Sequence, residues 1–401
     1  MKKNRPLWKK FLAIAASAFV LGLLPYIRQL ALTNSPSAGF SAMAAEFLPA
    51  LSKYVPLIAA AYVASIALLV LFEERNPDRT ILWLMTLAFL PIIGIILYML
   101  LGPDMKRIKM RKLFRPTKSY PSTKRLEWKR APARVRKTSV LAYRNSAADI
   151  CERCSVEILV DGNETFSAVK RELMGAKRYI DIEYFIFKND RLGREIADIL
   201  RERSWAGVRV RMIVDGVGSW KMGHDLKRAL REGGVDVRTF MPVSFPFFHS
   251  TINFRNHRKI IVVDGDVAFT GGLNVGVEYL GEGPLGRWRD THALFQGDAV
   301  RALNAIFLSD WAICSGENHS PDDPEFAPSP AGAPIPFTPT QIVPGGSGSA
   351  WRSIQQMYFL MIAEAQTRIW ITTPYLVPDA AIMDALKVAA LSGIDVQIIV
   401  P

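Results

Sequence analysis

The sequence predicts an α/β protein in which transmembrane helices precede a sheet with helices on its faces. The first observation is that three uncharged apolar stretches lie near the N-terminus. The second is that strand-like apolar runs alternate with helix-like periods through the rest of the chain, an order typical of α/β folds. The third is that the order of elements near residue 170 returns near residue 355, which indicates an internal duplication.

The apolar stretches support a membrane-embedded N-terminal region. Tyr54–Phe72 and Ile81–Leu101 carry no charge and match the roughly 20 residues that cross a hydrocarbon core. We therefore expect a transmembrane hairpin over residues 54–105. Phe11–Ile27 is shorter and contains Pro25, so a span, a signal-peptide-like segment and an interfacial helix all fit it. We favour a retained segment.

The net charge of +13 resides in one segment of the chain. Between Lys106 and Lys137 there are fourteen Lys or Arg and one acid, Glu127. A basic block next to a span marks a cytoplasmic flank and attracts anionic lipid. Nucleic acid also binds basic arms, but the position directly after Leu101 favours lipid. Three crossings from a cytoplasmic N-terminus would place the sheet domain outside. We give the larger basic cluster more weight and expect that domain on the cytoplasmic face.

The cysteines predict no disulfide framework. Cys151, Cys154 and Cys314 are the three in the chain, and an odd, sparse set is consistent with a reducing compartment. Cys151 and Cys154 have the spacing of half a zinc site, but the sequence has no second pair. We expect no structural metal there and no cofactor.

Composition divides the chain into six segments. Residues from Pro321 to Gly348 are rich in Pro, Gly, Ser and Thr, which is typical of a connector. The expected segments are an N-terminal segment (1–53), a transmembrane hairpin (54–105), a basic arm (106–138), a first sheet half (139–320), the connector (321–348) and the start of a second half (349–401).

Hydrophobic periodicity predicts the elements of both halves. Asp161-Gly162 is expected to form a turn. In the first half we expect helices at 165–176, 193–206, 225–231 and 299–311, and strands at 179–187, 208–214, 235–240, 260–263 and 267–270. In the second half we expect helices at 351–365 and 379–392, and strands at 368–373 and 394–400.

One pattern in the first half carries chemistry. It reads H-x-K-x4-D-x6-G-G-x-N and consists of His257, Lys259, Asp264, the pair Gly271-Gly272, and Asn274. Side chains two apart on a strand point to the same face, so His257 and Lys259 should act together. An imidazole can attack phosphorus, while an ammonium and amide donors stabilise the phosphoryl oxygens. Asp264 would orient an imidazole or set its protonation, and Asn274 would donate to a phosphate oxygen.

This pattern resembles the HKD motif of the phospholipase D superfamily. Its surroundings are similar to those of bacterial cardiolipin synthases over Arg255–Ile260, Gly271–Gly276 with Glu278 and Tyr279, and Trp288–His292. The resemblance implies a phospholipase D-like α/β sandwich behind the membrane helices, in a multi-pass protein of the bacterial inner membrane. It also implies a phosphatidyltransferase that joins two phosphatidylglycerol molecules and releases glycerol.

The resemblance also assigns roles within the motif. One motif histidine forms a phosphohistidine and a second acts as general acid and base, and His257 fits either role. Lys259 and Asn274 would stabilise phosphoryl charge next to Gly271 and Gly272. Glu183 and His292 would either line the pocket or serve as structural hydrogen-bonding partners. The partners implied are anionic phospholipid and a membrane, with no nucleic acid and no metal.

The family pairs two such motifs in one active site, and residues 1–401 contain one H-x-K-x4-D pattern. Gly207 and Gly393 occupy equivalent places in the duplication, which would put a second motif beyond Pro401. We therefore expect a chain truncated before its second motif. Phosphodiester hydrolysis and a catalytically incomplete, lipid-binding membrane protein are the alternatives to synthesis. Pairing of two chains as a homodimer is a route to a complete site.

Overall fold

The computed structural model describes residues 77–90, 97, 133–242, 255–284, 286–329, 335–336, 338–346 and 351–401. The chain forms two units, Met1–Gly102 and Pro103–Pro401, and each is considered by itself. In the first unit the described element is helix α3 (Pro77–Phe89).

The expected transmembrane segments fall largely outside the described residues. Phe11–Ile27 and Tyr54–Phe72 lie wholly outside them, and Ile81–Leu101 is described only over residues 81–90 and at residue 97. Within the described part of the chain, every helix is too short or too polar to cross a bilayer.

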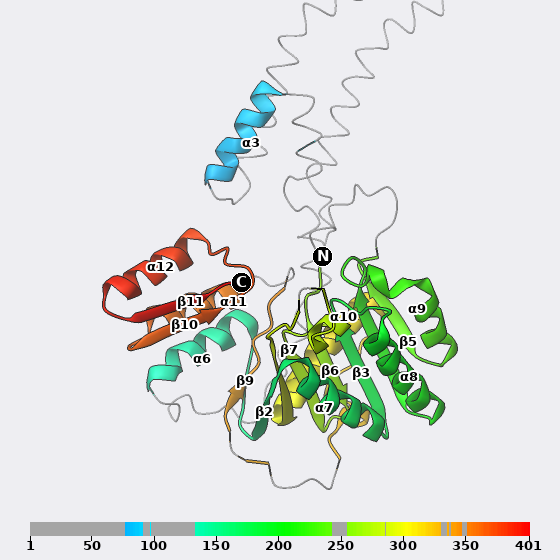
Figure 1. Cartoon of the computed structure of the whole chain (residues 1–401). Helices are drawn as coiled ribbons and strands as arrows, with labels where there is room; N and C mark the ends of the chain where they lie inside the picture. Colours follow the sequence, from blue (N-terminus) through cyan, green and yellow to red (C-terminus); the bar gives the residue numbers. More distant parts are fainter. Residues whose placement is uncertain are drawn as a thin grey trace, which may run out of the picture. The chain divides into compact units, whose positions relative to one another are not determined.

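The second unit is built on a seven-stranded mixed sheet in the order β2-β8-β7-β6-β3-β4-β5 (Figure 1). Strands β3, β4 and β5 are parallel, whereas β6 is antiparallel to β3 and the remaining neighbours are antiparallel. The strands are β2 (Cys154–Val160), β3 (Tyr179–Tyr184), β4 (Arg209–Asp215), β5 (Asp236–Phe240), β6 (Lys259–Val263), β7 (Val267–Gly271) and β8 (Thr291–Gly297).

Helices cover both faces of this sheet and divide the core in two. On one face the buried apolar residues of α7 and α8 pack against Ile261 and Val263 of β6. On the other, Phe307 and Trp311 of α10 lie in the same cluster as Ile260 and Val262. Both faces of β6 are therefore buried, which explains its continuous apolar run. The helices are α7 (Asp161–Gly175), α8 (Arg191–Trp205), α9 (Gly223–Glu232) and α10 (Asp298–Ser315), with short 3-10 turns η2 (Trp220–Met222), η4 (Val277–Leu280) and η5 (Pro324–Phe326).

The start of the second half repeats the order seen in the first. Helix α11 (Ser353–Ala363), strand β10 (Arg368–Thr372), helix α12 (Ala380–Leu391) and strand β11 (Asp395–Ile399) follow one another. Strands β10 and β11 pair in parallel, as β3 and β4 do. This agreement supports the interpretation of the chain as an internal duplication.

Several elements differ from the sequence expectation. Asp161 and Gly162 are the first two residues of α7 rather than a separate turn. The Glu164 carboxylate accepts the Val160 backbone amide at 2.7 Å, which caps the start of the helix. Helix α6 (Ala133–Ser146) begins inside the expected basic arm. Strands β2 and β8 were not expected, since neither has a long apolar run. The two-residue strands β1 (Ile150–Cys151) and β9 (Thr340–Gln341), which pair with each other, were also not expected.

Helix α6 packs against the second half. The Asn145 side-chain amide donates to the Gln356 side-chain oxygen at 3.2 Å, and the Ser353 hydroxyl donates to the Asn145 carbonyl at 3.2 Å. Because α6 precedes the seven-stranded sheet in the sequence and α11 follows it, these contacts join segments that are far apart along the chain.

Asp264 joins the end of β6 to the start of β3. Its carboxylate accepts hydrogen bonds from the backbone amides of Lys177 at 2.7 Å, Arg178 at 2.8 Å and Tyr179 at 2.8 Å. The residue is buried and adopts φ +54°, a conformation that asparagine and aspartate tolerate better than most residues. Asp264 is therefore a structural clamp between two central strands.

Removing this clamp should lower stability. We predict that Asp264→Ala lowers the free energy of unfolding by about 3 kcal/mol, since three backbone amides lose their acceptor at about 1 kcal/mol each. Asp264→Asn keeps one acceptor oxygen and should cost about half as much. Chemical unfolding of the purified chain measures both. Asp225→Ala, at an exposed position on α9, is the matched control, and equal midpoints for Asp264→Ala and this control would contradict the prediction.

Candidate active site

Most of the residues singled out in the sequence lie at one end of the central strands. Because β6 runs antiparallel to β3, its first residue Lys259 lies opposite Tyr184, where β3 ends. Strand β7 runs back to the same end of the sheet, and its last residue Gly271 lies opposite His292 of β8. His257, Gly272 and Asn274 flank these strand ends in the sequence. The exception is Asp264, which lies at the other end of β6 and contacts β3 instead of His257.

His257 and Lys259 are in direct contact. The Lys259 ammonium nitrogen lies 3.1 Å from Nδ1 and 3.4 Å from Nε2 of His257, and it donates to the His257 carbonyl at 2.9 Å. The Phe185 ring packs against the imidazole with 4.6 Å between centroids. Lys259 is buried, whereas His257 is exposed. The pair therefore presents an accessible imidazole backed by a fixed cation.

The electrostatics favour a neutral imidazole beside that cation. Desolvation lowers the pKa of His257 from its ordinary value, and the Lys259 ammonium lowers it further, while Asp215 opposes both effects. Burial lowers the pKa of Lys259 to about 8, and the Asp290 carboxylate counteracts part of this shift. Near pH 7 the imidazole is then an available nucleophile or base, and the lysine still carries its charge.

Buried carboxylates fix the loop that carries His257. Asp215, at the end of β4, accepts the backbone amide of Asn256 at 3.0 Å. The Asn256 side-chain amide donates to Glu183 of β3 and, at 3.1 Å, to Asp310 of α10. All three carboxylates are essentially inaccessible, at about 1% exposure. The residue before the histidine is therefore held by acids from three different elements.

The residue after the histidine is held on the opposite face of the sheet. The Arg258 guanidinium pairs with Asp310 and donates to the Gly345 carbonyl at 2.9 Å, and its backbone amide donates to the Asn256 side-chain oxygen at 3.0 Å. Alternation along the chain directs Arg258 towards α10 while His257 and Lys259 face the other way. Arg258 thus connects the motif loop to the connector.

Glu183 belongs to this buried support rather than to the accessible side of the site. Burial raises its pKa well above the ordinary value, and the neighbouring Asp310 charge raises it further. The Asp310 carboxylate, in contrast, pairs with the Arg258 guanidinium. The place of Glu183 under the motif loop matches the structural alternative for this residue.

The glycine pair makes room for a side chain of β8 and for one from the residue just before it. A Cβ atom on Gly271 would lie 2.5 Å from Nδ1 of His292, and one on Gly272 would lie 2.1 Å from a carboxylate oxygen of Asp290. Both distances are shorter than van der Waals contact allows. Glycine at these two positions therefore lets an imidazole and a carboxylate approach the strand that ends beside Lys259.

The Asn274 side chain makes two hydrogen bonds within the protein. Its side-chain oxygen accepts the Ile186 backbone amide at 3.2 Å, and its amide group donates to the Tyr279 hydroxyl at 2.7 Å. The residue is buried. Its side chain thus holds the segment after β3, which carries Phe185, beside the site.

Comparisons with known proteins identify the family of the chain. The family model described as "Cardiolipin synthase, PLD-like domain" matches residues 169–311 and 358–401. A model described as "Phospholipase_D-nuclease N-terminal" matches residues 59–103. A cardiolipin synthase of Halalkalibacterium halodurans is 40% identical over 84% of this chain and 69% of its own length. One from Geobacillus kaustophilus is 41% identical with the same coverage. The chain belongs to the cardiolipin synthase family of the phospholipase D superfamily.

Among solved structures, the phosphatidylserine synthase of Haemophilus influenzae Rd KW20 is similar at 14% identity and a TM-score of 0.47, covering 66% of each chain.

Several residues of this candidate site were not predicted as such. Asp215 follows a buried strand, a position where polar groups often serve a site at the strand end, and this signal could have identified it. Asn256, Arg258 and Asp290 were noticed only as flanks of the motif. Asp310 gives no sequence signal, because it lies inside a helix far along the chain and reaches the loop only through packing of α10.

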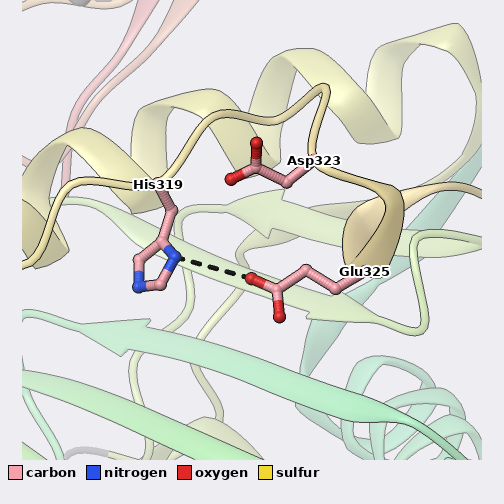
Figure 2. Close-up of side chains that lie close together, drawn as sticks. All are labelled: His319, Asp323 and Glu325. Carbon is pink, nitrogen blue, oxygen red and sulfur yellow. Dashed lines mark ion pairs between the residues drawn. The ribbon is translucent and has the colours of Figure 1, made fainter.

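A separate acidic cluster follows α10. His319, Asp323 and Glu325 place one ligand atom each within 4.8 Å of one another (Figure 2). Glu325 pairs with Arg209, and Asp323 accepts the Ser320 backbone amide at 2.8 Å. Phe326, next to this cluster, packs on Tyr179, the first residue of β3. The cluster therefore lies near the start of β3, whereas His257 lies near the end of that strand. Its acidic groups already have partners, and we assign no metal to it.

Proposed function

We propose that the chain transfers a phosphatidyl group from one phosphatidylglycerol to a hydroxyl of another, giving cardiolipin and glycerol. Membership of the cardiolipin synthase family supports this reaction. The observation that carries the assignment to a site is the contact between the accessible His257 imidazole and the buried Lys259 ammonium.

In the first step, a ring nitrogen of His257 attacks phosphorus and the bond from phosphorus to the glycerol oxygen breaks. The Lys259 charge stabilises the negative charge that gathers on the non-bridging oxygens. The leaving oxygen takes a proton from a general acid, a role that the family resemblance gives to the histidine of a second motif. In the second step, the same second-motif group, now deprotonated, takes the proton of a hydroxyl of another phosphatidylglycerol. The hydroxyl oxygen bonds to phosphorus and the bond from phosphorus to the His257 nitrogen breaks.

The same site would hydrolyse the phosphohistidine if water replaced the lipid hydroxyl, and phosphatidic acid would then be the product. Membership of the cardiolipin synthase family favours the lipid hydroxyl as the acceptor. We further propose that the chain works at a membrane, because a family model for an N-terminal region matches residues 59–103 and fourteen basic residues follow.

Loss of the nucleophile should abolish turnover. We predict that His257→Ala lowers cardiolipin formation in phosphatidylglycerol vesicles by at least about a thousandfold, as expected for a group that acts in the reaction itself. Product analysis by mass spectrometry measures cardiolipin, glycerol and phosphatidic acid together. His224→Ala, at an exposed position, is the control. Unchanged consumption of phosphatidylglycerol by His257→Ala would refute the proposal, and phosphatidic acid as the main wild-type product would replace synthesis with hydrolysis.

The charge on Lys259 should set the alkaline limit of activity. Its pKa is lowered to about 8, so the ammonium is present below that pH and lost as the pH rises through it. We predict that kcat/KM falls above about pH 8. Lys259→Arg should move this limit upward because a guanidinium stays charged. An alkaline limit at the same pH in both proteins would show that another group titrates.

A further inference from the structure

His292 is a buried polar side chain without a protein partner. It is 1% exposed, and neither ring nitrogen has a hydrogen-bond partner among the described residues. A buried donor or acceptor left in this state costs roughly 1–3 kcal/mol. Such groups are rare in folded proteins and call for a specific explanation.

The position of His292 connects it to the reactive residues. It lies opposite Gly271 on β7, and Thr270 of β7 lies opposite Ile260 of β6, so Gly271 separates His292 from Lys259. Adjacent strands are about 4.8 Å apart. Gly271 has no side chain, and the imidazole occupies the space that a Cβ there would fill. Gly271 is itself exposed. The imidazole thus lies close beneath an accessible stretch of backbone next to Lys259.

The charge state of His292 determines what it can bind. Burial, reinforced by the Lys259 ammonium, lowers its pKa to about 4, so the ring is neutral under physiological conditions. A neutral imidazole offers one donor and one acceptor, which is the complement of an alcohol. An ammonium headgroup would instead be repelled by the Lys259 ammonium, and it could bind only to the acceptor nitrogen of His292.

We propose that His292 binds a hydroxyl of the glycerol headgroup while the phosphate lies at Lys259, and that it thereby selects polyol headgroups over amine headgroups. This inference rests on the proposed function, because it takes phosphatidylglycerol as the substrate. It adds a specificity-determining residue to the site, and it assigns to Gly271 the task of keeping the imidazole within reach.

A direct test uses nuclear magnetic resonance on the full chain in detergent. The chain has five histidines, so ¹⁵N-histidine labelling gives few signals, and comparison with His292→Phe assigns that of His292. The His257→Ala background prevents turnover. Adding dihexanoyl-phosphatidylglycerol should shift the His292 ring nitrogens, whereas dihexanoyl-phosphatidylethanolamine should leave them unchanged. Binding is followed independently by ³¹P signals of the lipid.

The outcomes separate the two proposals. Phosphatidylglycerol that binds without shifting His292 would overturn the role of this residue and leave the proposed function standing. No binding of phosphatidylglycerol at all would contradict both. A shift of equal size with phosphatidylethanolamine would overturn the selectivity.

Kinetics supply a second measurement with conservative variants. His292→Phe should raise KM for phosphatidylglycerol about tenfold with a smaller change in kcat, and it should reduce the preference for phosphatidylglycerol over phosphatidylethanolamine. His292→Asn, which keeps a donor and an acceptor, should recover part of that preference. His224→Phe is the control for loss of a histidine. A fall in melting temperature with an unchanged preference in both variants would show that His292 is purely structural.

Discussion

The site depends on the buried carboxylates beneath the loop that carries His257. Residues 255–258 are not part of a strand, so the sheet alone does not fix their position. Asp215, Glu183 and Asp310 hold Asn256, and Asp310 also pairs with Arg258. Breaking a buried pair by removing one partner typically costs 3–5 kcal/mol. The histidine is therefore placed by the residues on either side of it.

The opposite flank of the site uses small residues instead of charges. Gly271 and Gly272 let His292 of β8 and the preceding Asp290 approach, while Asn274 holds the segment after β3 through Ile186. The buried carboxylates thus fix the loop that carries His257, whereas the glycine pair allows His292 and Asp290 to lie near Lys259. The two sides meet where β6 begins and where β3 and β7 end.

Sequence reasoning predicted the alternating α/β order, the strand between Lys259 and Asp264, and the gathering of His257 and Lys259. These features follow from local periodicity and spacing. It did not predict that Asp264 clamps β3, that Asn274 holds backbone, or that Asp310 supports the loop. Each of these contacts joins elements far apart in the chain, such as α10 and the loop before β6. Register and packing determine them, and a single sequence does not encode either in its local pattern. Strands β2 and β8 were missed because they lack a long apolar run.

Amide hydrogen exchange in residues 255–259 tests most directly whether the buried carboxylates position His257. Asp310→Asn removes the charge that pairs with Arg258, while Asp322→Asn alters an exposed ion pair with Arg301 and is the matched control. Exchange at residues 256–259 should become at least about tenfold faster in Asp310→Asn and stay at the wild-type rate in Asp322→Asn. Equal rates in the wild type and Asp310→Asn would contradict the account, because the loop would then be held without its buried acids.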